Sequence, residues 1–396
     1  MADFPVLTNL QRQMNSAHKN SLKRGEEMAV YQAGEIPCNE TSDAARLCRN
    51  PLVSVHMTTY NHEGFIRQAI EGVVMQETDF EYELVIGEDC STDRTREICF
   101  EYQKKHPTKI RVLWSESNLW HIGGNHKRVD VRCRGKYIAY CEGDDYWTDP
   151  KKLQKQVEYM ESHPGCAGCF HERVKCDEEG QIMEGTGLPD EMKRPLTGED
   201  IVAWTFPCPP TCTVLYRREV VMDRPAWMNG LFFGDRATAI WGGYAHGTVD
   251  WVAGVDPSVY RIHRGGVYRG KDLVYRFLLE HAFSDAIMQH FPVSRAVREV
   301  IYRTWKSETF WGWRKWHANE SAEIRYAVSE LVRQDIKAAP SLRWYFMMKK
   351  YCYWMERVRA MTWHGFVLGL KSAMPKGAYG KLRLAWRVRR GEEHVG

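Results

Sequence analysis

The chain has 396 residues, of which 43% are hydrophobic and 27% are charged, as is usual for a globular protein with a sizeable core. No stretch reaches the roughly 18 consecutive apolar residues of a membrane span, and the first residues lack the apolar core of a signal peptide. We therefore expect a cytoplasmic protein without a transmembrane helix.

The net charge of +4 is unevenly distributed along the chain. Residues 341–396 contain 12 Lys and Arg against 3 Asp and Glu, a net of +9, which leaves −5 for the rest. A basic end of this kind predicts an anionic partner. Aromatic residues at helical spacing favour peripheral binding to the inner face of an anionic membrane. A helix hairpin packed on the main domain is the alternative, and no motif indicates nucleic acid.

From Pro51 onward, strand-like and helix-like patterns alternate. Apolar, β-branched runs predict strands at residues 52–59, 82–86, 110–114 and 136–141. Helical spacing predicts helices at 65–74 and 94–105, and a short basic helix follows the glycine-rich loop at 122–125. This alternation predicts βαβ units, and hence an α/β fold with a mostly parallel sheet.

The second part of the domain is less regular. It contains strand-like runs at residues 166–175, 212–217 and 259–264, and helical stretches at 193–204 and 237–244. Beyond about residue 271 the pattern is helical. We therefore divide the chain into a partly helical leader (1–50), an α/β domain (51–270) and a helical, basic C-terminal region (271–396).

The twelve cysteines mostly lie inside apolar runs. Cys166 and Cys169, followed by His171, have the spacing of a zinc site. A strand at this position would point the two cysteines apart, so we expect them to act as small buried hydrophobic residues.

The strand at 136–141 ends in three acidic residues, Glu142, Asp144 and Asp145. Carboxylates this close together repel one another unless a cation or hydrogen-bond donors neutralise them. A solvated acidic turn before a helix is the alternative. Loops that follow parallel strands meet at one edge of the sheet, where such sheets bind ligands. The same edge should therefore collect the polar residues after the other strands: Thr59, Tyr60, Asn61, Glu63, Glu88, Asp89 and Asp93.

Five motifs in this order resemble the inverting family-2 glycosyltransferases of the GT-A fold, over residues 51–270. The first strand and loop (53–63, VSVHMTTYNHE) and the second (83–95, ELVIGEDCSTDRT) are similar to that family's nucleotide-binding segments. Residues 137–147 (YIAYCEGDDYW) resemble its DxD-bearing strand. The motifs FGD (233–235) and YRIH (260–263) resemble the segments that carry its catalytic base and a metal-binding histidine.

The resemblance implies a GT-A nucleotide-diphospho-sugar transferase fold, Rossmann-like, and a role for each motif. Asp144 and His263 would hold Mn²⁺ or Mg²⁺, and Asp235 would be the general base. The donor site would comprise Thr59, Tyr60, Glu63, Asp89, Lys127 (or Arg128), Glu142 and Asp145. A carboxylate can accept the imide N–H of uracil or thymine, so we expect a UDP- or dTDP-sugar as donor. The acceptor would be a saccharide or a lipid-linked molecule in surface polysaccharide or glycoconjugate assembly.

The sequence also departs from the family pattern. Glu142 replaces the first aspartate of the DxD motif, and Cys90 stands where glycine is frequent. Two alternatives remain open, a sugar-phosphate nucleotidyltransferase and a non-catalytic protein that binds nucleotide sugars. The first would be expected to carry a glycine-rich phosphate loop and a basic residue directly after the first strand, and Thr59 and Tyr60 provide neither.

Overall fold

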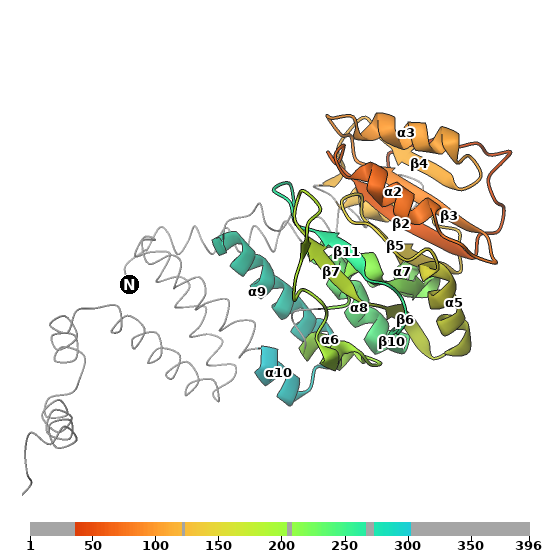
Figure 1. Ribbon diagram of the computed structural model, residues 1–396. Helices are drawn as coiled ribbons and strands as arrows, with labels where there is room; N and C mark the ends of the chain where they lie inside the picture. Colours follow the sequence, from red (N-terminus) through yellow and green to blue (C-terminus); the bar gives the residue numbers. More distant parts are fainter. Residues whose placement is uncertain (1–35, 121–122, 204–207, 267–272, 302–396) are drawn as a thin grey trace, which may run out of the picture. The chain divides into compact units, whose positions relative to one another are not determined.

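The structure is a computed structural model that describes residues 36–301, apart from 121–122, 204–207 and 267–272 (Figure 1). The chain divides into two compact units, Met1–Leu331 and Val332–Gly396. The second unit, and with it the basic aromatic end, lies outside the described residues. Among the described helices, none combines the length and the apolar character needed to cross a bilayer.

The centre of the first unit is an eight-stranded, mostly parallel sheet. Strands β2 to β5 run in parallel, β1 and β9 run against their neighbours, and β10 is parallel to β6. The strand order is β1 (Asn39–Thr41), β4 (Ile110–Trp114), β3 (Tyr82–Glu88), β2 (Val53–Thr59), β5 (Tyr137–Tyr140), β9 (Leu215–Arg217), β6 (Cys166–Phe170) and β10 (Thr248–Trp251). The predicted α/β fold with a mostly parallel sheet is confirmed.

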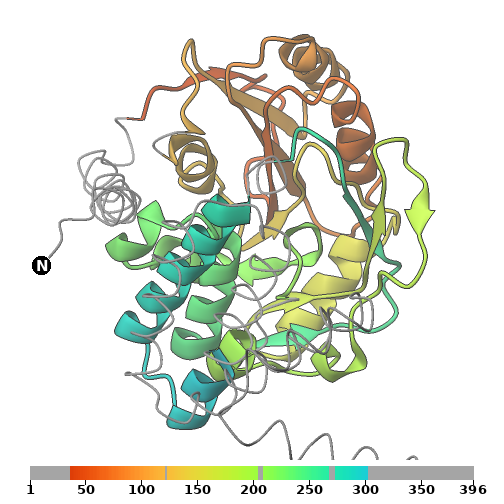
Figure 2. The same cartoon turned by 90° about the vertical axis from the view of Figure 1, so that its left-hand side faces the viewer.

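Helices cover both faces of this sheet, which explains why its central strands are buried along almost their whole length. Helices α2 (Ile66–Val74), α3 (Thr95–Lys105) and α5 (Lys152–Ser162) share one hydrophobic core with alternate residues of β2 and β3. The opposite face is covered by α4 (Gly124–Asp130), α6 (Gly198–Ala203), α7 (Arg218–Met222) and α8 (Gly234–Ala245). Figure 2 shows α2 and α3 in orange to the right of the strands, and α4 and α8 to the left.

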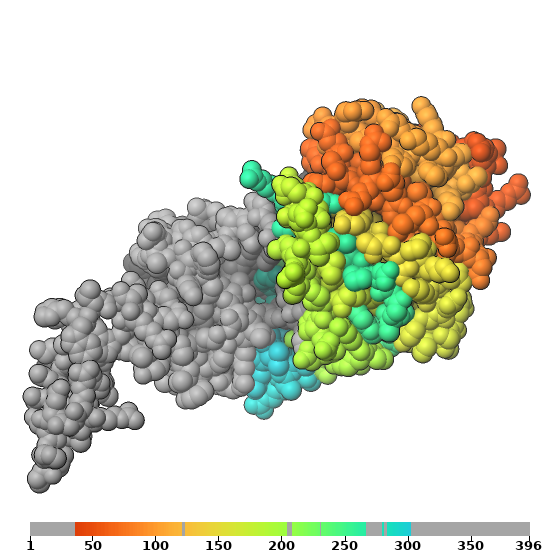
Figure 3. Space-filling view, viewed as in Figure 1, coloured from red at the N-terminus to blue at the C-terminus, as the bar shows by residue number. Residues whose placement is uncertain are grey.

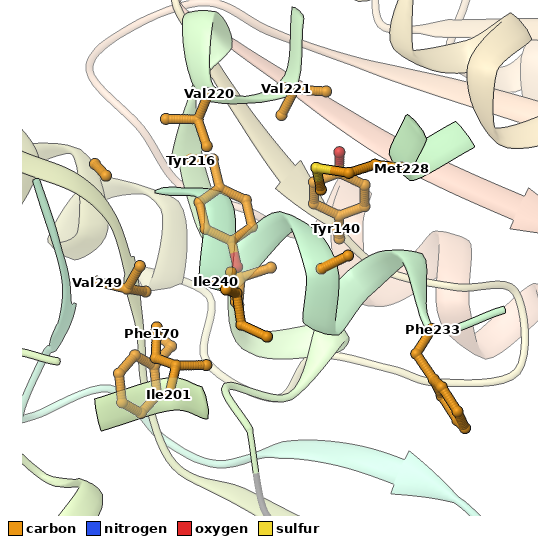
Figure 4. Close-up of a cluster of buried hydrophobic side chains, with 14 of the residues drawn as sticks. Tyr140, Phe170, Ile201, Tyr216, Val220, Val221, Met228, Phe233, Ile240 and Val249 are labelled. Atoms are coloured by element: carbon orange, nitrogen blue, oxygen red, sulfur yellow. The ribbon is translucent and has the colours of Figure 1, made fainter. Parts of the chain in front are cut away.

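The second core contains large side chains from distant parts of the chain (Figure 4). Tyr140 of β5, Tyr216 of β9 and Ile240 of α8 meet there. Two further helices, α9 (Leu273–His290) and α10 (Arg295–Ile301), contribute Phe283 and Ile301 to it. The predicted boundary at residue 271 therefore falls inside a continuous packing unit. The boundary at residue 50 likewise separates β1 from the sheet to which it belongs.

The run at 166–175, predicted as one strand, forms two strands in different sheets. After β6 the chain leaves the central sheet, and β7 (Arg173–Cys176) lies between β11 (Ser258–Arg261) and β8 (Ile182–Met183) in a three-stranded sheet. The space-filling view shows this segment in yellow-green beside the orange first half (Figure 3). Cys166 and Cys169 do not point apart as expected, because both join the same core, where burial raises the pKa of Cys166 to about 12.

Candidate functional site

Three loops meet at the carboxyl edge of the sheet. They follow β2, β5 and β11, which are far apart in the sequence. Backbone hydrogen bonds in both directions join Tyr146, after β5, to Val259 of β11, at 3.2 and 2.9 Å. The carboxylate of Asp145 accepts a hydrogen bond from the backbone N–H of Arg261 at 2.9 Å. The acidic loop and the strand that leads to His263 are thus held together directly.

His62, Asp144 and His263 form a compact group with one potential metal-ligand atom each. Nε2 of His263 lies 3.0 Å from Oδ2 of Asp144, and Nε2 of His62 lies 4.0 Å from the same oxygen. All three ligand atoms lie within 4.8 Å of one another. Desolvation lowers the pKa of His62 and so favours the neutral imidazole that a metal ion requires. In the described part of the chain, this is the group of side chains suited to hold a metal ion.

The carboxylates around this group act on one another. Desolvation and the nearby charges of Asp144, Asp145 and Asp235 raise the pKa of Glu142 well above its usual value. Desolvation and Asp144 likewise raise the pKa of Asp145, whose Oδ2 is buried without a hydrogen-bond partner. Asp144 differs, because hydrogen bonding and charge from the two histidines outweigh its desolvation and lower its pKa. Concentrated negative charge of this kind favours a bound cation.

Asp235 lies in the first turn of α8, and its side chain is exposed. The hydroxyl group of Thr211 donates a hydrogen bond to its Oδ2 at 3.1 Å. The charge of Asp235 contributes to the raised pKa of Glu142, so Asp235 belongs to the same acidic cluster. Asp235, which the resemblance makes the general base, therefore lies near the acidic loop in exposed surroundings.

Thr59 and Asp89 lie at the neighbouring ends of β2 and β3. The carbonyl group of Thr59 accepts the backbone N–H of Asp89 at 3.0 Å, and Oδ1 of Asp89 accepts that of Leu119 at 2.8 Å. Both side chains are buried, whereas Tyr60 is exposed. Cys90 has a φ of 61°, a left-handed conformation that glycine adopts most easily. This conformation gives a physical reason for the glycine that the family often has there.

Some predicted residues have structural partners instead. Glu63 accepts the backbone N–H of Arg94 at 3.1 Å, at the start of α3. Arg128, the alternative to Lys127 as a phosphate contact, is fully buried and donates to the carbonyl group of Glu88 at 2.8 Å. It therefore cannot reach a phosphate. Lys127 is half-buried on α4, where desolvation and the charge of Arg224 lower its pKa.

Sequence reasoning missed two residues of this site. His62 belongs to the loop after β2 and could have been found, because loops that follow parallel strands meet at one edge of the sheet, and this holds for His62 as it does for Thr59. Its Nδ1 lies 3.2 Å from the hydroxyl oxygen of Thr59. Thr211 precedes β9, which runs antiparallel to β5. A rule that searches only the residues after each strand cannot find it.

Comparison with known proteins agrees with this arrangement. Residues 54–224 match the model of glycosyl transferase family 2. An uncharacterized protein of Mycobacterium tuberculosis is 38% identical over 171 residues, which cover 43% of this chain and 48% of the relative. TuaG of Bacillus subtilis, provisionally named a teichuronic acid biosynthesis glycosyltransferase, is 36% identical over 120 residues, covering 30% and 46%. The chain thus spans about half the length of these two relatives.

The fold is shared with a solved structure. The crystal structure of residues 1–349 of S. aureus TarS in complex with UDP-GlcNAc matches with a TM-score of 0.54 at 16% identity, covering 73% of this chain and 81% of that one. This likeness supports an α/β fold of the GT-A type. Residues 54–224 match glycosyl transferase family 2, so the resemblance seen in the sequence is confirmed for this part of the chain.

Proposed function

We propose that this protein is a metal-dependent, inverting glycosyltransferase that moves a sugar from a UDP- or dTDP-sugar to a hydroxyl group of its acceptor. The observation that carries the proposal is the grouping of His62, Asp144 and His263, within 4.8 Å of one another, beside an acidic cluster that includes Asp235. The match to family 2 supports the reaction class.

The residues of this group fit a divalent ion. Two imidazole nitrogens and a carboxylate oxygen suit Mn²⁺ better than Mg²⁺, which prefers ligand sets made of oxygen. Asp144, His263 and His62 would hold the ion, and Glu142 would stay in the surrounding shell. When bound, such an ion neutralises the charge of the leaving diphosphate.

Asp235 would remove the proton from the acceptor hydroxyl group. The acceptor oxygen then forms a bond to the anomeric carbon on the face opposite the leaving group, while the bond from that carbon to the diphosphate oxygen breaks. The proton ends on the carboxylate of Asp235, and the nucleoside diphosphate leaves with the electron pair. Attack from the opposite face inverts the configuration at the anomeric carbon.

On the donor side, Asp89 and Thr59 would position the nucleoside, with Tyr60 beside them, while Lys127 would face the phosphates. Desolvation raises the pKa of Asp89, so binding of an imide N–H would replace hydration that the carboxylate has already lost. Glu63 and Asp145 would act indirectly, through the backbone groups of Arg94 and Arg261 that they bind.

The acceptor would be a saccharide or a lipid-linked molecule, as in surface polysaccharide assembly. The name of TuaG supports this class of pathway. Peripheral binding to the inner face of the membrane through residues 341–396 would bring the enzyme to a lipid-linked acceptor. Flotation with anionic liposomes tests this point, because the full chain should float and a chain ending at residue 340 should not. Equal flotation of both chains would exclude membrane binding through this region.

The central experiment is a screen with UDP-glucose, UDP-GlcNAc, dTDP-glucose and GDP-mannose, each with and without Mn²⁺. We expect stabilisation in a thermal-shift assay and slow release of nucleoside diphosphate by a uridine or thymidine donor, both dependent on Mn²⁺. Asp235→Asn should bind that donor normally and lose its hydrolysis. Binding without hydrolysis in the wild type would indicate the non-catalytic alternative. Release of pyrophosphate from UTP and a sugar 1-phosphate would indicate the nucleotidyltransferase.

A further inference from the structure

A short 3₁₀ turn, η3 (Thr211–Thr213), links three parts of the site. The hydroxyl group of Thr211 donates to Oδ2 of Asp235 at 3.1 Å. The next carbonyl group, that of Cys212, accepts the indole N–H of Trp147 at 2.8 Å. The carbonyl group of Thr213 accepts the side-chain amide of Gln156 in α5 at 2.9 Å. Three consecutive residues thus contact the proposed base, the acidic loop and the helix behind it.

The turn itself is firmly held. Pro209 and Pro210 precede it, and proline restricts the backbone. The carbonyl group of Pro210 accepts both the backbone N–H of Thr213, at 2.9 Å, and its hydroxyl group, at 2.7 Å. The side chains of Cys212 and Thr213 are fully buried. The hydroxyl group of Thr211 therefore projects from a rigid support, whereas the carboxylate of Asp235 is exposed at the end of a helix.

We infer that Thr211 is a positioning residue for the general base, an inference that rests on the proposed role of Asp235. By binding Oδ2, Thr211 restricts rotation of the carboxylate and leaves Oδ1 to receive the acceptor proton. An exposed aspartate would otherwise occupy several rotamers, and only some of them would face the anomeric carbon. Fixing the correct one before the reaction removes an entropic cost from the chemical step.

The turn also fixes the position of the proposed base relative to the acidic loop. Trp147 lies only three residues after Asp144, and its side chain is buried. The path from Trp147 through the Cys212 carbonyl group to Thr211 and Asp235 uses two hydrogen bonds and one short stretch of backbone. Diphosphate binding and proton removal therefore depend on a common support, and the loss of the Thr211 hydroxyl group should affect only the second of them.

The test compares Thr211→Val, which removes the hydroxyl group with little change in shape, with Thr211→Ser, which keeps it. The substrate is the nucleotide sugar that the wild type hydrolyses fastest in the screen above, with Mn²⁺. We expect kcat to fall about tenfold in Thr211→Val, with KM and the thermal shift on donor binding unchanged. Thr211→Ser should keep kcat within about threefold of the wild type.

Thr213→Val is the matched control, because it removes a hydroxyl group of the same turn that contacts Pro210 and not Asp235. It should lower the melting temperature and leave kcat of the folded protein unchanged. An equal loss of kcat in Thr213→Val and Thr211→Val, or no loss in Thr211→Val, would overturn the inference. If Asp235→Asn stays active, or if no donor of the panel is hydrolysed, the proposed function fails first. An inactive Asp235→Asn with a fully active Thr211→Val would reject only the role of Thr211.

Discussion

Two glutamates at opposite ends of the central sheet, the buried Glu83 and the half-buried Glu142, have opposite electrostatic surroundings. Glu83, near the start of β3, accepts hydrogen bonds from Ser54 at 2.6 Å, Arg134 at 2.6 Å and Arg111 at 3.2 Å. Its desolvation is outweighed by these partners, and its pKa is lowered. Glu142, after β5, has carboxylates as its charged neighbours, and desolvation together with these charges raises its pKa.

The contrast distinguishes charge that the protein neutralises with its own side chains from charge that a bound ligand would neutralise. At the amino edge, each carboxylate oxygen of Glu83 has a partner within the protein, so the cluster is complete without a ligand. At the carboxyl edge, acidic groups gather around Glu142, and within the described part of the chain the charges that mainly shift its pKa are those of carboxylates. Such an arrangement costs folding free energy, and a cation together with the substrate would offset that cost. The following predictions test this division.

The largest effect should come from Asp144→Asn, which removes the central carboxylate of the metal-binding group. We expect hydrolysis of the nucleotide sugar to fall at least about a hundredfold, because a neutral amide holds a divalent ion poorly. The melting temperature of the free protein should change little, because the loss of repulsion with Glu142 and Asp145 is offset by the loss of the contact with His263. Steady-state kinetics with added Mn²⁺ and a thermal melt measure both. Activity near that of the wild type would place the metal elsewhere.

At the other end of the sheet, Glu83→Ala should act on stability. It leaves Arg134 without its carboxylate and Arg111 with that of Glu40 alone, so the free energy of unfolding should fall by about 3 kcal/mol. Urea denaturation followed by circular dichroism measures this fall. Lys136→Ala is the control, because its bridge to Glu161 lies at the surface and should contribute less than about 0.5 kcal/mol. Similar losses in both variants would contradict the interpretation that the ion pairs of Glu83 stabilise the fold.

The pH dependence of stability should reveal Asp89. Its pKa is raised, mainly by desolvation. At pH values between the unfolded-state pKa and the folded-state pKa, the folded protein therefore keeps a proton on Asp89 that the unfolded chain has released. Stability from this group is therefore present at low pH and is lost as the pH rises through the folded-state pKa. Asp89→Asn should lack this decline. Urea unfolding of both proteins between pH 4 and 7 gives the difference, and parallel curves would exclude the effect.

The smallest effect should come from Cys90, the residue with a φ of 61° directly after Asp89. In Cys90→Gly, relief of the left-handed conformation is largely offset by the entropy of glycine in the unfolded chain, so a gain of about 0.5 kcal/mol is expected. Cys90→Val should destabilise, because a β-branched side chain fits this conformation poorly. Thermal melts rank the three proteins, and a valine variant as stable as the wild type would contradict the expected order.

The part of the fold that could be predicted consists of strands with a clear pattern. β2 to β5 are parallel strands buried along almost their whole length, so each is a short apolar run. Helical spacing appears between β2 and β3 and between β3 and β4. The second half resists such prediction, because its strands are short and lie in two sheets. Nothing in the run at 166–175 marks the point after Phe170 where the chain leaves one sheet for the other.

The site was predictable to the extent that topology alone brings residues together. Asp144 and His263 meet because both follow strands that end at the same edge. His62 obeys the same rule, but a lone histidine in a turn has many ordinary structural roles. Thr211 could not be inferred, since it reaches the edge from the start of β9, a strand of opposite direction whose place in the sheet depends on long-range packing.

The short strand β1 bears on how the protein can be shortened. It lies antiparallel along the outer side of β4, with Glu40 bound to Arg111 and the hydroxyl group of Thr41 to the indole N–H of Trp114. A chain trimmed to Pro51 keeps all the proposed catalytic groups, yet it uncovers the unpaired backbone of β4. Two such molecules could pair edge to edge, so trimming there should yield aggregates of an otherwise intact protein.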